Sequence, residues 1–301
     1  MSAAILASLT PAALPKILPG YLASLIVDAD VCASARARVA AIVDAWPEET
    51  SRQLLDTLET LGQEHRVYYA HPAAREISRA WCGAAFSSWA VDGVENLRAA
   101  HTAGPTMIVC NHTSYLDTSA TDALLAWSGN ADLADRLVAI AGPKVYAELF
   151  RRVASACLNT LPVPQSSTIA HAEPLPPREI ARRAICSLDA ASAACIAGDI
   201  PLLYAEGSRS RTGHLGSFLK ATHRYLDLAD GISVVPTVIL GTREAMPIDE
   251  ERLHPGPVTL RFGPALPQGL PARERLAAAH AAVAALLPED HMPYPETPPV
   301  C

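Results

Sequence analysis

The amino-acid sequence predicts an α/β fold, in which a mostly parallel central sheet is flanked by helices and preceded by an all-helical N-terminal segment. Short apolar runs alternate with longer helical stretches after about residue 91, a pattern typical of parallel sheets that are covered on both faces. The first 90 residues show helical spacing instead. Half of the 301 residues are apolar, so the chain can bury a large core.

The N-terminal segment, residues 1–90, is expected to form three or four helices. Apolar residues recur at three- and four-residue spacing in "ARARVAAIVDAW", and Thr50 or Ser51 can cap the helix that follows. Residues 72–90 continue the helical pattern. The apolar N-terminus lacks a cationic leader and is interrupted by prolines, so the sequence predicts neither a signal peptide nor a membrane-spanning helix. Residues 1–30 could still lie on a membrane surface. Whether residues 1–90 bind a membrane, a partner or only the catalytic domain stays open.

Residues 91–267 are expected to form a sheet-bearing domain. Its predicted strands cover residues 106–110, 137–142, 200–205, 233–240 and 258–263. Residues 268–301 are expected to form a C-terminal helix and a proline-rich tail. In folds of this class, functional residues collect beyond the carboxyl ends of the strands.

Charge and cysteine content exclude several classes of function. The net charge is −7 and the Lys and Arg residues are scattered, so no broad cationic face indicates nucleic acid as a partner. The seven cysteines form no C-x-x-C pair and no zinc-spaced array, which predicts reduced thiols in a cytoplasmic protein and no metal site. Signatures of serine hydrolases, P-loop proteins, zinc proteases and dinucleotide-binding proteins are absent.

The first candidate site is "NHTSYLD", residues 111–117, directly after the first predicted strand. On a continuous helix His112 and Asp117 would lie about 140° apart and could not meet. If the chain bends and Thr113 or Ser114 caps a new helix, the carboxylate returns to the imidazole. It then fixes the tautomer, and the other ring nitrogen takes a proton from a substrate hydroxyl. The alternative is an unconnected loop histidine and a helix-start acid.

The second candidate site is "EGSRSR", which follows the third predicted strand. Gly207 lets backbone N–H groups approach a ligand closely, while Arg209 and Arg211 can both grip a phosphate or carboxylate. Glu206, at the strand end, can orient these arginines or contact the ligand. The sequence therefore predicts either an anion cradle or, as the alternative, a plain turn with solvated arginines.

Together, in this order and about 90 residues apart, the two motifs resemble those of the glycerolipid acyltransferase family, the lysophosphatidic acid acyltransferase-like proteins. The first block of that family, N-H-x-S-x-x-D, is matched by Asn111, His112, Ser114 and Asp117. The third block, usually E-G-T-R-S-R, is matched by residues 206–211 with Ser208 in place of Thr. "VVPTVIL", which contains Pro236, is similar to the fourth block. The resemblance covers residues 91–267, which are identified as an acyltransferase domain.

The resemblance implies transfer of a fatty acyl group from acyl-CoA or acyl-carrier protein to a hydroxyl of a lysophospholipid or glycerol 3-phosphate. It implies that His112 is the general base, that Asp117 orients it, and that the phosphorylated acceptor is held by Glu206, Gly207, Ser208, Arg209 and Arg211. A thioester donor is already activated, so we expect no cofactor besides this co-substrate and no metal. Because an acyl chain needs an apolar environment, we expect a peripheral enzyme on the inner face of the cell membrane.

The second block of the family is matched only in part, by Lys144, Glu148 and Leu149. The Pro and Gly that usually follow are missing, and Gln165 stands near the place where an acceptor-binding arginine is common. The acceptor therefore stays open between lysophosphatidate, glycerol 3-phosphate, a lyso-amino-acid lipid and a non-lipid alcohol. Two other classes are a non-catalytic lipid- or acyl-carrier-binding relative, which the intact base pair disfavours, and a thioesterase-like hydrolase, which the two arginines disfavour.

Overall fold

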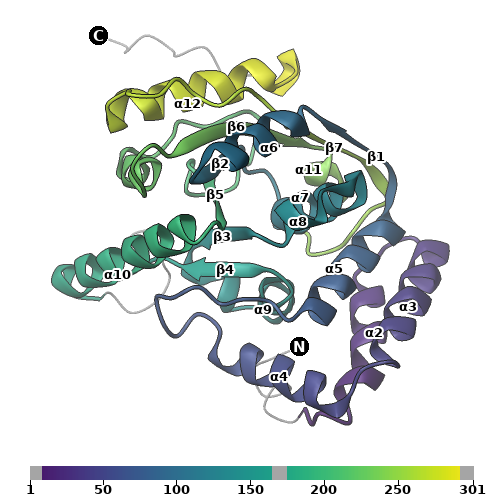
Figure 1. Cartoon of the computed structure of the whole chain (residues 1–301). Helices are drawn as coiled ribbons and strands as arrows, with labels where there is room; N and C mark the ends of the chain where they lie inside the picture. The colour runs from purple at the N-terminus through teal and green to yellow at the C-terminus, as the bar shows by residue number, and fades with distance from the viewer. Residues whose placement is uncertain (1–8, 165–174, 292–301) are drawn as a thin grey trace.

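One sheet runs through the middle of the molecule (Figure 1). The structure, a computed structural model, describes residues 9–164 and 175–291. Within them, seven strands lie in the order β1-β7-β6-β2-β5-β3-β4. From β6 to β4 all neighbours are parallel, whereas β7 is antiparallel to β6 and parallel to β1. The strands are β1 (Phe86–Asp92), β2 (Thr106–Cys110), β3 (Leu137–Ala141), β4 (Asn159–Pro162), β5 (Ile200–Tyr204), β6 (Ser233–Leu240) and β7 (Gly256–Phe262).

Helices cover both faces of the sheet because its central strands are apolar on both sides. All residues of β2 are buried, and alternate residues of a strand point to opposite faces. Ile108 and Cys110 join one apolar core with the N-terminal helices, while Met107 and Val109 join a second core. The second core is completed by α10 (Pro177–Ile196), the short helix η3 (Lys220–Asp227) and α12 (Ala272–Leu286).

The N-terminal helices share their core with the helices that follow β2 and β3. A buried ion-pair network joins α5 to α7: Arg75 Nη1 lies 2.6 Å from Asp122 Oδ1, and Arg79 Nε lies 2.8 Å from Asp122 Oδ2. The helices on this side are α2 (Leu14–Ser24), α3 (Ala29–Val43), α4 (Glu48–Thr60), α5 (Pro72–Ala85), α7 (Asp117–Leu125) and α9 (Leu149–Ala156). Three further helices are α6 (Val94–Ala103), α8 (Ala131–Ala134) and α11 (Thr242–Ala245).

The predicted α/β class, with its mostly parallel sheet and N-terminal helices, is confirmed. All five expected strands are present with ends within two residues of the prediction, and β1 and β4 are additional. The expected cap by Thr50 or Ser51 is wrong, because α4 begins at Glu48 with Pro47 at its N-cap. The helix expected over residues 72–90 is wrong in its last part, because α5 ends at Ala85 and β1 begins at Phe86. From there the chain pairs with β7 instead. The expected domain boundary after residue 90 falls within β1.

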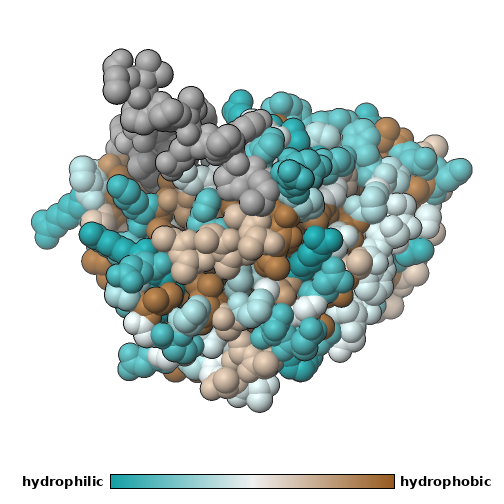
Figure 2. Space-filling model, turned by 90° about the horizontal axis from the view of Figure 1, so that it is seen from above, coloured by the Kyte–Doolittle hydropathy of each residue, from teal (hydrophilic) through white to brown (hydrophobic). Residues whose placement is uncertain are grey.

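The outer surface mixes polar and apolar side chains, as Figure 2 shows for the face seen from above. In the described part of the chain, no helix has both the length and the apolar character that crossing a bilayer requires. The described cysteines are free thiols: Cys32, Cys82, Cys110, Cys157, Cys186 and Cys195. Gln165, Cys301 and the proline-rich tail after residue 291 lie outside the described residues.

Candidate active site

The loop after β2 brings His112 and Asp117 together. Asp117 is the first residue of α7, and its Oδ2 lies 2.8 Å from His112 Nδ1. The same oxygen accepts the backbone N–H groups of Thr113 at 2.8 Å and Ser114 at 3.0 Å. These bonds bend the chain between the two residues, as their spacing predicted. The expected cap by Thr113 or Ser114 is wrong, because Leu116 stands at the N-cap of α7 and makes no side-chain cap bond. The alternative of an unconnected histidine and acid is wrong.

Asp117 is fully buried and its other oxygen also has a partner. Thr242, at the start of α11, donates its hydroxyl to Asp117 Oδ1 at 2.6 Å. The imidazole of His112 stacks on the Tyr204 ring, with ring centroids 4.2 Å apart. Its Nδ1 faces the carboxylate, and its Nε2 makes no hydrogen bond to any described residue. This leaves one ring nitrogen for a substrate proton.

Asn111 and Ser114 hold the loop that carries the histidine. The Asn111 side chain accepts from Ile239 N at 2.8 Å and donates to Ile239 O at 3.0 Å, which ties the end of β2 to β6. Ser114 Oγ donates to Met246 O at 2.8 Å. Pro236 lies within β6, paired with Val109, so it belongs to the sheet rather than to the loop.

Glu206, the second residue after β5, holds the backbone of the first motif. Its Oε1 accepts the His112 N–H and its Oε2 the Gly216 N–H, each at 2.8 Å. Burial raises the pKa of the Glu206 carboxyl to about 7, because desolvation outweighs the two hydrogen bonds. Ser210 N donates to His112 O at 2.7 Å. The two motifs therefore form one hydrogen-bonded pair of loops.

Gly207 requires glycine for its backbone conformation, since its φ of 70° lies in the left-handed region. Arg209 places its guanidinium over the Tyr115 ring, with Cζ 3.5 Å from the ring centroid. Burial is the main cause that lowers the pKa of Arg209. Ser208 and Arg211 are exposed. Of the two predicted arginines, Arg209 is the one seen in contact with the loop that carries His112.

Lys144 lies on the short helix η2 (Pro143–Tyr146) and its carbonyl accepts from Arg151 Nη1 at 3.0 Å. Arg151 also donates to Tyr115 Oη at 2.9 Å. Sequence reasoning missed the neighbours of the base pair, Tyr115, Arg151, Tyr204 and Thr242. Thr242 follows the end of a predicted strand, a position that could have drawn attention to it. Arg151 lies inside a helix and carries no such signal.

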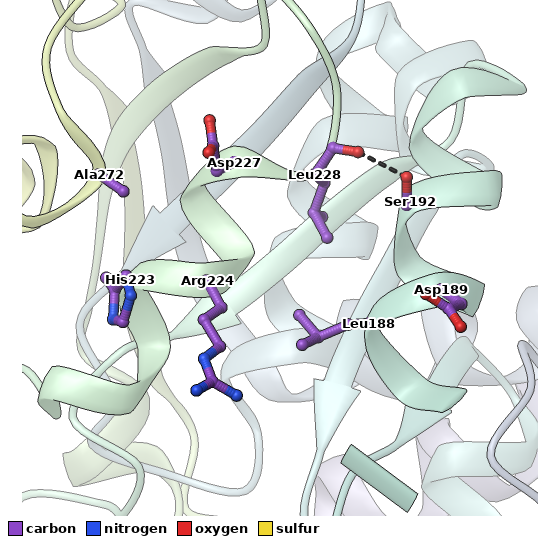
Figure 3. Close-up of a pocket in the computed structure, with 8 residues that line it drawn as sticks. All are labelled: Leu188, Asp189, Ser192, His223, Arg224, Asp227, Leu228 and Ala272. Atoms are coloured by element: carbon purple, nitrogen blue, oxygen red, sulfur yellow. Dashed lines mark hydrogen bonds between the residues drawn. The ribbon is translucent and has the colours of Figure 1, made fainter. Parts of the chain in front are cut away.

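Two cavities in the described part of the chain are lined by none of the predicted site residues. One of about 390 Å³ lies between α10 and η3, with Leu188 facing Arg224 and His223 (Figure 3). A second, of about 570 Å³, is lined by Trp89 and Trp127 beside β1. Among the described residues, no group of three or more His, Cys, Asp or Glu side chains is arranged to hold a metal ion.

Comparison with known proteins identifies the family of the chain. The family model described as "Acyltransferase" matches residues 89–240, half of the chain. Among solved structures, the chain is similar to the crystal structure of the 1-acyl-sn-glycerophosphate (LPA) acyltransferase PlsC from Thermotoga maritima. The identity is 19%, the TM-score is 0.51, and the match covers 89% of this chain and 94% of that chain. A comparison with curated proteins gave no significant match. The family match confirms the resemblance seen in the two motifs, and the chain belongs to the acyltransferase family of enzymes.

Proposed function

We propose that this enzyme transfers a fatty acyl group from acyl-CoA or acyl-carrier protein to the hydroxyl of a lysophospholipid such as 1-acylglycerol 3-phosphate. The main support is the His112–Asp117 contact of 2.8 Å, which leaves His112 Nε2 without a described partner. The half-buried Arg209 on the same loop pair favours an anionic acceptor. A phosphate ester is such an acceptor.

In the proposed reaction His112 Nε2 takes the proton of the acceptor hydroxyl as its oxygen attacks the thioester carbonyl carbon. The Asp117 carboxylate stabilises the imidazolium that forms. The tetrahedral intermediate then collapses, the C–S bond breaks, and the leaving thiolate takes the proton from the imidazolium. The products are an ester and a free thiol. No other co-reactant enters this balance, so the proposal includes no metal and no cofactor.

The acceptor and product of this reaction carry acyl chains, so we place the enzyme at the cytoplasmic surface of the cell membrane. Among the alternative acceptors, glycerol 3-phosphate keeps the anionic group that Arg209 favours, whereas a non-phosphate alcohol does not. We propose no role for nucleic acid.

The proposal is tested by following thiol release from long-chain acyl-CoA and from acyl-carrier protein. Each donor is supplied with lysophosphatidate, with glycerol 3-phosphate or with neither, and wild type is compared with His112→Ala. We expect release that depends on lysophosphatidate, yields acylated product and is lost in the variant. Release without any acceptor would indicate a hydrolase. Identical behaviour of wild type and variant with every pair would remove the catalytic assignment and favour a binding protein.

A further inference from the structure

Two guanidinium groups gather on one tyrosine ring beside the base. Tyr115 is three residues after His112 in the loop that Asp117 closes. Arg209 Cζ lies 3.5 Å and Arg151 Cζ 4.7 Å from the centroid of its ring. Like charges held so close repel each other, and the charge of Arg151 is one cause of the lowered pKa of Arg209, after burial. An arrangement of this kind is stabilised when an anion binds between the cations.

Arg151 has only weak counter-charges of its own among the described residues. Its Nε lies 3.0 Å from Glu251 Oε1, and Nη2 lies 3.9 Å from Glu148 Oε1. The buried Nε forms no hydrogen bond with a described residue, so its contact with Glu251 is a close approach of charges without hydrogen-bond geometry. Both glutamate side chains are exposed, by 43% and 61%, while that of Arg151 is 15% exposed. Ion pairs with exposed carboxylates of this kind contribute little free energy to the stability of the protein.

The position of Arg151 is fixed by its remaining hydrogen bonds. Nη1 donates to Tyr115 Oη at 2.9 Å and to Lys144 O at 3.0 Å. The guanidinium is thereby held against the tyrosine of the catalytic loop before any acceptor arrives. A cation placed in advance loses less conformational entropy on binding a ligand.

We infer that Arg151 and Arg209 together bind the phosphate of the acceptor, with Arg151 acting as the second cation. This inference rests on the proposed function. Arg151 comes from α9 and Arg209 from the loop after β5, so the two cations reach the Tyr115 ring from different elements. The phosphate displaces Glu251 from Arg151, and the acceptor hydroxyl is presented to His112 on the same loop.

The test compares two acceptors that differ only in the phosphate: lysophosphatidate and a monoacylglycerol with the same acyl chain. Steady-state kinetics are measured at saturating donor for wild type, Arg151→Gln and Arg151→Lys. For Arg151→Gln we expect the KM for lysophosphatidate to rise about 10- to 100-fold, the effect of losing a charge-assisted hydrogen bond. The kcat and the KM for monoacylglycerol change less than about threefold. Arg151→Lys keeps the charge and recovers part of the affinity.

Arg98→Gln is the matched control. Arg98 pairs with the exposed Asp132 at 2.8 Å. It lies on α6, which precedes β2, whereas His112 follows the carboxyl end of β2. Its removal takes away the same charge at a distance, and both KM values are expected to match wild type.

For Glu251→Gln we expect the KM for lysophosphatidate to change in the opposite direction to that of Arg151→Gln. If Glu251 competes with the phosphate for Arg151, its neutralisation lowers the KM for lysophosphatidate severalfold and leaves that for monoacylglycerol unchanged. A purely structural role of the Arg151–Glu251 contact predicts no such gain. This variant also keeps the inference open to refutation if Arg151→Gln fails to fold.

The outcomes separate the inference from the proposed function. If wild type acylates neither acceptor, the proposed function fails and the inference fails with it. If wild type acylates both acceptors equally well, acyl transfer stands and only the inference is overturned. If wild type prefers lysophosphatidate while Arg151→Gln shifts both KM values equally or neither, only the inference is overturned. An unchanged or raised KM for lysophosphatidate in Glu251→Gln also overturns it.

Discussion

At the scale of single residues, Asp117 both folds the catalytic loop and orients the base. Its carboxylate faces His112 Nδ1, two backbone N–H groups and the Thr242 hydroxyl. The backbone contacts require only an oxygen acceptor, whereas stabilisation of an imidazolium requires the negative charge. The two roles can therefore be separated by an isosteric substitution.

Asp117→Asn is expected to lower kcat by about 10²- to 10⁴-fold while the protein stays folded. Because the two residues act as a unit, adding this change to His112→Ala should slow the reaction no further. Acyl transfer is measured for both single variants and the double variant, with circular dichroism as the check on folding. A multiplicative loss in the double variant would contradict a shared role.

Glu206 makes the stability depend on pH. Its pKa is raised from 4.5 to about 7 in the folded protein, so between these values the folded state retains a proton that the unfolded state has released. The free energy of unfolding therefore decreases as pH rises through this range, by about 3 kcal/mol in total from this group. In Glu206→Gln this part of the pH dependence should vanish, as urea denaturation from pH 4.5 to 7.5 will show. Equal slopes in variant and wild type would be inconsistent with the shift.

At the scale of elements, the turn between β6 and α11 positions the second partner of Asp117. Gly241 has a φ of 86°, and a Cβ there would lie 2.0 Å from the carbonyl oxygen of Pro257. That backbone atom cannot rotate away, so the turn requires glycine. The next residue is Thr242, which donates to the catalytic aspartate. A distortion of this turn would therefore displace the Thr242 hydroxyl from Asp117.

Gly241→Ala is expected to lower the free energy of unfolding by more than about 2 kcal/mol, because left-handed strain is combined with a backbone clash. It should also reduce kcat by displacing Thr242. Gly231→Ala is the matched control: its φ is 67°, but a Cβ there meets no atom within 4 Å. It should cost only the strain of about 1 kcal/mol. Chemical denaturation and kcat are measured for both, and equal losses would contradict the role of the clash.

The elements that sequence reasoning found are those with a strong local signal. β2, β5 and β6 are continuous apolar runs because helices cover both faces of the sheet. β1 was missed because most of its side chains are exposed, so it lacks the alternation that marks a half-buried strand. β4 has only four residues and ends in a proline. Both lie at the edges of the sheet, where pairing depends on distant partners.

The same distinction holds for the site. The His112–Asp117 contact was predictable because both residues lie in one loop and the bend between them follows from local geometry. The approach of Glu206 to the His112 backbone depends on β2 and β5 being neighbours, and the sequence indicates only that both residues end strands. Arg151 reaches Tyr115 from α9, a contact that only the packing of helices against the sheet establishes.

At the scale of the whole molecule, the N-terminal helices and the sheet share one core. A charged link joins α5 to α7, which packs in this core: Asp122 is fully buried and bonded to Arg75 and Arg79. A buried carboxylate that loses a cation is strongly destabilising, since desolvation is no longer offset. The helices are therefore expected to unfold together with the sheet.

Arg75→Met is expected to lower the free energy of unfolding by about 3 kcal/mol, with a single cooperative transition retained. Arg98→Met removes the exposed pair with Asp132 and should cost less than about 1 kcal/mol. Urea denaturation followed by fluorescence and by far-ultraviolet circular dichroism compares the two. Two separate transitions in the wild type would show that the helices form an independent unit.

The peptide of His112 is held on both sides by the second motif, since Glu206 accepts its N–H and Ser210 donates to its carbonyl. Its amide proton and that of Ser210 are thus protected by the same pair of loops, and solvent reaches both through one opening event. In hydrogen–deuterium exchange, the amides of His112 and Ser210 should show the same degree of protection. An acceptor bound to Arg209 should slow the exchange of both amides together. An anion bound at the second loop would thus reduce the opening of the loop that carries His112.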